Sequence, residues 1–174
     1  MTPVEVAPVE AVATVTAPTV AAVEAEGLML IDAKNGFNEL GRKAMFWTVW
    51  HRWAAGARFA FNCYRHEIRL LLRQPGGTGL TLHSREGVTQ GDPLAMALYG
   101  IALLPLAERL REESPSVMQP WYAGDAAMMG VPAEVTKAMI LLTKLGPMFR
   151  YFPEPEKLYV ICIKTDEADT RVAF

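Results

Sequence analysis

The chain has 174 residues, 51% of them hydrophobic, and a formal net charge of −2. This length suffices for one domain with a buried core, and the composition excludes a wholly disordered chain. Its two cysteines, Cys63 and Cys162, exclude a disulfide framework and indicate a reducing compartment. The first 27 residues contain no Lys or Arg and no uninterrupted apolar run, so we expect no signal peptide. The longest apolar stretch, residues 93–107, is too short to span a bilayer. We therefore expect a soluble intracellular protein, nuclear or cytoplasmic and not secreted.

The charges are distributed unevenly. Residues 33–85 contain nine Lys or Arg and two acids, so this block carries 9 − 2 = +7. A basic block of this kind can follow a phosphate backbone, although a solvated helix face explains it equally simply.

Residues 1–27 consist mostly of Val, Ala, Pro, Thr and Glu, and Pro3, Pro8 and Pro18 interrupt any regular element. This composition predicts a low-complexity, disordered leader. The folded domain is expected to cover residues 28–163, followed by a C-terminal tail at 164–174.

Strand and helix patterns follow in turn. An apolar run at 28–32 predicts a buried strand, and apolar residues at helical spacing predict a deeply packed helix from the cap Asn38 to about Trp53. Asp92 as N-cap and Pro93 at the first helical position predict a helix to about residue 113. The other expected elements are a helix at 57–66, a hairpin of 67–73 and 78–84, a hairpin of 117–122 and 126–129 turning at 124–125, a helix at 133–145 and a strand at 158–163. This order lacks regular β-α-β repetition, which predicts the α+β class.

Three motifs occur in order: Asp-Ala-Lys-Asn-Gly-Phe at 32–37, Gly-Val-Thr-Gln-Gly-Asp-Pro-Leu at 87–94 and Tyr-Ala-Gly-Asp at 122–125. Together they resemble motifs A, B and C of the reverse transcriptase palm, and residues 146–157 are similar to motif D. The likeness covers residues 28–163 and is greatest to non-LTR retroelement enzymes. It implies a palm-like antiparallel sheet backed by helices, here without counterparts of the fingers and thumb. The faces that those parts normally cover could promote association.

The resemblance implies nucleotide addition from a dNTP to a primer on an RNA or DNA template. In this reaction two Mg²⁺ or Mn²⁺ ions stabilise the attacking and leaving oxygens, and carboxylates are suitable ligands. Asp32 resembles the motif A metal ligand, and the carbonyl of Ala33 could complete its coordination. Asp125 corresponds to the second acid of motif C. Taken alone, Asp32 also fits a residue that caps a nearby backbone group.

Three further residues resemble nucleotide-binding positions. Phe37 lies where the family has a steric gate under the sugar, although a core Phe fits as well. Gln90 and Gly91 resemble the motif B pair that contacts nucleotide and template, and glycine permits close backbone approach. The same two residues also fit a helix-entry turn.

Two positions bear on the chemistry. Gly124 replaces the first acid of motif C, which normally shares both metals with the motif A acid; losing such a group costs about 10²- to 10³-fold in rate or more. Gly124 and Asp125 also suit an ordinary turn. Lys157 resembles the motif D general acid for pyrophosphate. Leu158 and Arg150 depart from the motif D pattern, so an ordinary surface lysine is the alternative.

These observations favour a retroelement reverse-transcriptase-like palm, by descent an RNA-directed DNA polymerase, that is inactive or severely impaired. The alternative is a non-catalytic module for nucleic-acid binding or protein association, and a decaying open reading frame is a third interpretation.

Overall fold

The computed structural model describes residues 27–77 and 79–162. Residues 1–26 of the expected leader, the tail at 164–174 and the last residue of the expected final strand lie outside this part. Within it no helix is long and apolar enough to cross a membrane.

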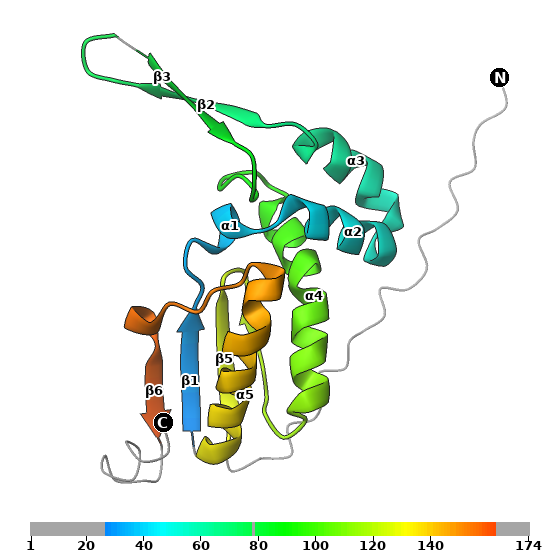
Figure 1. Ribbon diagram of the computed structural model, residues 1–174, viewed down its shortest axis with the longest axis vertical. Coiled ribbons are helices and arrows are strands. Elements are labelled where there is room, and N and C mark those ends of the chain that lie inside the picture. Colours follow the sequence, from blue (N-terminus) through cyan, green and yellow to red (C-terminus); the bar gives the residue numbers. More distant parts are fainter. Residues whose placement is uncertain (1–26, 78, 163–174) are drawn as a thin grey trace, which may run out of the picture.

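A four-stranded antiparallel sheet with the order β4-β5-β1-β6 forms the base of the molecule (Figure 1). The central strand β1 lies between β5 and β6, and its last residue, Asp32, pairs with Asp125 of β5. The predicted strand at 28–32 is therefore confirmed. The strands are β1 Gly27–Asp32, β4 Trp121–Tyr122, β5 Asp125–Gly130 and β6 Tyr159–Cys162.

Two helices, α4 (Ala95–Glu113) and α5 (Pro132–Leu145), pack together, and α5 lies on β1 and β5 (Figure 1). Burial alternates along β1: Met29 and Ile31 are buried in the core, whereas Leu30 is exposed on the opposite face. An antiparallel sheet with one covered and one solvated face explains this alternation. The molecule is thus a palm-like α+β domain.

The remaining elements lie beyond the end of β1. The hairpin of β2 and β3 is a separate two-stranded sheet that projects from the body, and α2 packs against both α3 and α4 (Figure 1). These elements are α1 Gly36–Glu39, α2 Arg42–Arg52, α3 Ala54–Tyr64, β2 Ile68–Arg73 and β3 Gly79–Ser84, and two short 3₁₀ turns, η1 Gly146–Phe149 and η2 Pro155–Lys157, precede β6.

The helix predicted from Asn38 to Trp53 is wrong as one element. Asn38 lies inside α1, and the chain is extended at Leu40 and Gly41 before α2 begins. The interruption has a tertiary cause, because the Leu40 carbonyl accepts a hydrogen bond from the Gly87 amide. The predicted deep packing is also wrong in part, since Trp47 and Trp50 are 61% and 67% exposed.

Two local predictions need smaller corrections. The helix expected at Asp92 begins at Ala95, and the Asp92 carboxylate instead accepts the amide of Leu94 at 2.9 Å in the turn before it. The second hairpin turns at residues 123–124, because Asp125 already pairs with Tyr122. Strand β4 is short, since Pro120 has no amide to donate to a neighbouring strand.

The buried Arg42 joins α2 to the root of the hairpin. Its guanidinium donates to the carbonyls of Gly87 at 2.8 Å and His66 at 3.0 Å, and its backbone amide donates to the Glu86 carboxylate at 2.9 Å. Burial lowers the pKa of Arg42, and Glu86 opposes that shift. These hydrogen bonds offset the free-energy cost of burying the charged guanidinium. Removal of the guanidinium would leave buried carbonyls unpaired.

We predict that Arg42→Met lowers the free energy of unfolding by about 3 kcal/mol, because it orphans these carbonyls. Lys43→Met, at the exposed neighbouring position, should change it by about 0.5 kcal/mol or less. Urea unfolding followed by circular dichroism measures both, and equal small effects would contradict the joining role of Arg42.

The hydroxyls of two buried tyrosines differ in their hydrogen bonding. Tyr64 donates to the Asp92 carboxylate, whereas the Tyr99 hydroxyl has no hydrogen-bond partner among the described residues. Burial is the main cause of the raised pKa of both. A Cβ on Gly36 would lie 2.5 Å from the Tyr99 hydroxyl, so only glycine leaves room for it there. The Tyr99 ring stacks on Phe37 with centroids 4.9 Å apart.

We expect Tyr99→Phe to leave the free energy of unfolding unchanged or to raise it by about 1 kcal/mol, because an unpaired buried hydroxyl is removed. The same change at Tyr64 should lower it by about 1.5–3 kcal/mol, because a hydrogen bond to a charged group is lost. Thermal and urea unfolding compare the matched pair, and a larger loss at Tyr99 would overturn the assignment.

Candidate functional site

The register of β1 and β5 places two carboxylates side by side. Asp32 and Asp125 are paired residues of neighbouring antiparallel strands, so their side chains leave the same face of the sheet. That face is the one opposite the buried Met29 and Ile31. The arrangement follows from the two-residue period of a strand, because the buried residues at 29 and 31 send residue 32 to the open face.

A tight turn precedes Asp125 and carries Gly124. The Ala33 amide donates to the Gly124 carbonyl at 3.1 Å, and the buried Tyr151 hydroxyl donates to the same carbonyl at 3.2 Å. Ala123, with a φ of 52°, adopts the left-handed conformation. Gly124 itself is not among the residues with a positive φ, so the turn does not require glycine there for its backbone angles, contrary to the simple turn interpretation of that residue.

A pocket of about 300 Å³ opens at this end of the sheet. Its lining combines residues from four separate parts of the chain: the end of β1 with α1, the loop before α4, the 123–124 turn, and η2. The lining residues are Asp32, Ala33, Asn35, Gly36, Phe37, Asn38, Gln90, Ala123, Gly124, Asp125 and Lys157. Every residue to which the resemblance assigns a catalytic, metal-binding or nucleotide-binding role is among them except Gly91.

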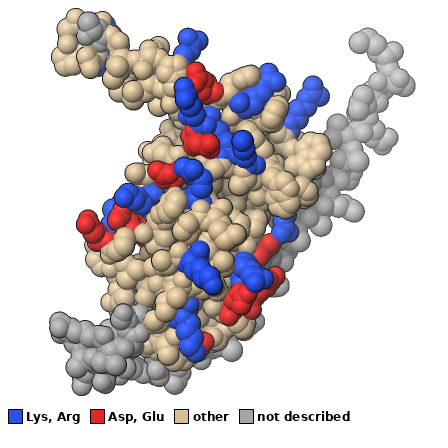
Figure 2. Space-filling view, in the orientation of Figure 1, with Lys and Arg blue, Asp and Glu red and all other residues tan. Residues whose placement is uncertain are grey.

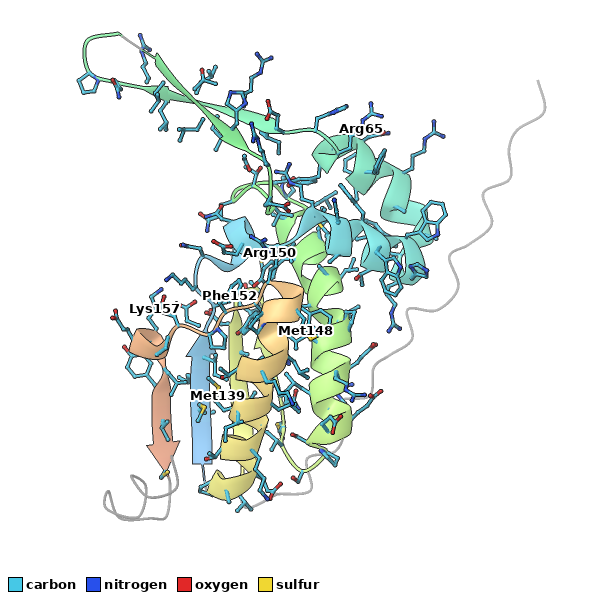
Figure 3. The ribbon with its side chains drawn as sticks, in the orientation of Figure 1. Arg65, Met139, Met148, Arg150, Phe152 and Lys157 are labelled. Atoms are coloured by element: carbon cyan, nitrogen blue, oxygen red, sulfur yellow. The ribbon has the colours of Figure 1, made fainter. Side chains whose placement is uncertain are left out.

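Lys157 forms an ion pair with Asp32 in this pocket. Its ammonium lies 2.6 Å from the Asp32 carboxylate, and Figure 3 shows it beside the end of β1. The turn η2 brings it there, because the Glu154 amide donates to the Asp32 carbonyl at 2.8 Å. The hydrogen bond to Asp32 raises the pKa of Lys157, and Glu154 and Asp125 add smaller contributions. The lysine is 61% exposed, so solvent screens the pair.

The loop that carries Gln90 rests on α1. The amides of Gly87 and Val88 donate to the carbonyls of Leu40 and Phe37 at 2.7 and 2.8 Å. Gly87 has a φ of +74°, and a Cβ there would lie 2.4 Å from the Phe37 carbonyl, so glycine is required at this contact. The close contact directs Gln90 into the pocket. Gly91, with a φ of +91°, serves the turn and does not line the pocket.

Position 124 has room for a side chain. A Cβ built on Gly124 meets the Ala33 side chain at 3.9 Å and the Tyr99 hydroxyl at 4.0 Å, which are ordinary contacts. The charge at this position, rather than the space for it, is therefore what distinguishes glycine from aspartate.

Sequence reasoning missed part of the lining. Asn35 and Asn38 line the pocket, although the sequence predicts Asn38 as a helix cap. Asn35 has a φ of 47°, a conformation that asparagine tolerates better than most residues, and this tendency was the available signal. Tyr151 and its bond to the Gly124 carbonyl gave no signal, because no local pattern relates a residue in the 146–157 segment to the turn at 124.

Comparisons with known proteins identify the fold. No protein-family model and no curated protein sequence matches the chain. Among solved structures it is similar to telomerase from Candida tropicalis in complex with a TWJ fragment of telomeric RNA, with 12% identity and a TM-score of 0.63 over 84% of this chain and 28% of that one. It is also similar to apo telomerase from C. tropicalis truncated from the C-terminal domain, with 14% identity and a TM-score of 0.60 over 81% of this chain and 31% of that one. The chain thus spans less than a third of these telomerases, and at such identity the likeness shows only that it shares the fold of that part of them.

Proposed function

We propose that this chain is a reverse-transcriptase-like palm of retroelement origin, by descent an RNA-directed DNA polymerase, and that it is inactive or severely impaired. The supporting observation is that residues of all four motif segments line one pocket, although they lie far apart in the sequence. The similar solved structures support the fold, and two of them are telomerases bound to a fragment of telomeric RNA. The ligands proposed for this pocket are a dNTP and the end of a template-primer, whether RNA or DNA.

The pocket offers few oxygen ligands for Mg²⁺ or Mn²⁺. Asp32 and Asp125 supply two carboxylates, the Ala33 carbonyl is a further candidate oxygen, and one carboxylate is already paired with Lys157. Within the described ranges no group of three or more His, Cys, Asp or Glu could hold a metal ion. These residues fit one weakly held hard cation and do not fit two. When bound, such an ion supplies electrostatic stabilisation of oxyanions.

The other lining residues have binding roles in this proposal. Phe37, held by stacking on Tyr99, packs under the sugar of the nucleotide. Gln90 contacts the nucleotide from the loop seated on α1. Lys157 is the general acid, but its ammonium is held by Asp32, so productive proton donation requires that this pair separate. The missing carboxylate at position 124 and the Asp32–Lys157 pair together account for the proposed loss of activity.

We predict that the chain binds Mn²⁺ weakly and that Gly124→Asp tightens binding about tenfold or more, equivalent to about 1.4 kcal/mol. The reason is a third carboxylate at a position where a side chain fits. Isothermal titration and Mn²⁺ electron paramagnetic resonance measure the affinity. Adding Asp32→Asn to the Gly124→Asp variant should abolish the gain.

Gly100→Asp is the matched control, because it adds the same charge at an exposed position of α4 where a Cβ meets nothing. It should not alter Mn²⁺ affinity.

Primer extension with Mg²⁺ should be at background for the unmodified chain. Extension by the unmodified chain at rates typical of active polymerases would refute the inactivity, and equal effects of both Asp substitutions would refute the metal role of position 124.

The second candidate function is a non-catalytic module that binds nucleic acid or associates with protein. The basic block supports it: Arg69 and Arg73 lie on one face of the β2–β3 hairpin, because side chains alternate along a strand. The same face also carries the exposed Leu71 and His83, and His83 pairs with Glu67. The opposite face is apolar and carries Ile68, Leu70, Leu72, Leu80 and Leu82. An amphipathic projecting hairpin suits contact with a phosphate backbone through its basic face.

For this second function we expect oligonucleotide binding that weakens with salt. Arg69→Gln with Arg73→Gln should reduce the slope of log affinity against log salt by about 1.4 to 1.8, because two phosphate contacts are lost. Fluorescence anisotropy at several salt concentrations measures the slope. Arg109→Gln on α4 is the control, and the absence of binding at low salt would eliminate this candidate.

A further inference from the structure

A second pocket, of about 420 Å³, lies between α2 and α3, away from the candidate site. Its lining is apolar and aromatic except for one cation: Phe46, Trp50, Ala57, Arg58 and Phe61. Two of these residues, Phe46 and Phe61, are in edge-to-face contact with ring centroids 5.4 Å apart. Trp50 and Phe61 are 67% and 48% exposed, so a large apolar surface faces solvent here. We call this pocket the α2–α3 groove.

The stretch of sequence that forms the groove carries basic residues and no acid. Residues 40–66 contain five Lys or Arg and no Asp or Glu. Figure 2 shows the basic side chains gathered over α2, α3 and the root of the hairpin, and Figure 3 shows Arg65 at the end of α3. Arg52 pairs with Glu108, whereas Lys43 and Arg58 make no ion pair within residues 27–77 and 79–162. An occupant of this groove should therefore be apolar and acidic.

One segment of the same chain has that composition. Residues 1–26 contain four Glu, seven Val and no Lys or Arg. Residues 3–12 read Pro-Val-Glu-Val-Ala-Pro-Val-Glu-Ala-Val, so each Glu lies between apolar neighbours and two prolines favour an extended backbone. Aromatic-lined grooves bind extended proline-containing segments, which lose little conformational entropy on binding. The charge of the segment is opposite to that of the groove.

The segment is also long enough to extend well past the far end of β1. Residue 12 is 15 residues before Gly27, where β1 begins, and an extended chain of that length spans about 50 Å. Strand β1, which separates this attachment point from the end of the sheet nearest α1 and α2, covers about 20 Å. From these observations we propose that residues 3–12 dock in the α2–α3 groove of their own chain, with Glu5 or Glu10 paired to Arg58 and valines against Trp50 and Phe61.

The test uses the full chain with a nitroxide label on a cysteine introduced by Ala7→Cys, in a background with Cys63→Ser and Cys162→Ser. The indole N–H signals of the four tryptophans report the distance to the label. Trp50 lines the groove, whereas Trp121 lies on β4 and does not line it. Paramagnetic broadening should be several-fold greater for Trp50 than for Trp121.

Charge reversal distinguishes docking from random approach. Glu5→Lys with Glu10→Lys, and separately Arg58→Glu, should reduce the broadening of Trp50 to the level of Trp121. Glu24→Lys with Glu26→Lys, and Arg111→Glu on α4, are matched controls that should leave it unchanged. Equal broadening of all four tryptophans, or local broadening that ignores these reversals, would overturn the proposal.

A mixed sample identifies the chain that supplies the segment. Spin-labelled chain at natural isotope abundance is mixed with ¹⁵N-labelled chain that carries no nitroxide. Docking within one chain predicts no broadening of Trp50 in this mixture. Broadening there would assign the groove to a second copy and overturn docking within the chain. Failure of metal binding in the candidate site would leave this result unaffected, because the groove shares no residue with that pocket.

Discussion

The antiparallel pairing of β1 with β5 is the constraint on which the candidate site depends. It places Asp32 opposite Asp125, and the Ala33 amide continues the pairing to the Gly124 carbonyl. Helix α5 covers one face of these strands, so the same packing that forms the core sends both carboxylates to the open face. A shift of β1 by one residue against β5 would bury Asp32 and expose Met29 and Ile31.

Around this pair, position 124 has room for a side chain but carries no charge. Gly124 keeps its carbonyl bonded to both Ala33 and Tyr151, and an ordinary side chain would fit there. Lys157, in the turn before β6, forms an ion pair with Asp32 and so places a positive charge in the pocket. The backbone framework thus does not depend on a carboxylate at position 124, because hydrogen bonds to main-chain atoms define the turn.

The local sequence pattern predicts some elements of the fold and not others. The strand at 28–32, the hairpin at its glycine-rich turn and the end of the long helix near residue 113 follow the sequence closely, because apolar period, turn residues and proline act over a few positions. The break between α1 and α2 is not predicted by the local sequence, because it depends on a hydrogen bond from the Gly87 amide to the Leu40 carbonyl, 47 residues away. The exposure of Trp47 and Trp50 likewise depends on which helices pack against α2.

The sequence by itself determined the α+β class and the order of the motif residues, because hydrophobic period and short motifs are properties of neighbouring positions. It also indicated most of the pocket lining, from Asp32 and Phe37 to Gln90, Asp125 and Lys157. Only the tertiary structure decided that Lys157 pairs with Asp32, that Tyr151 holds the turn at Gly124, and that Gly91 stays outside the pocket. These contacts join segments up to 125 residues apart, so strand register and helix packing, rather than local preference, fix them.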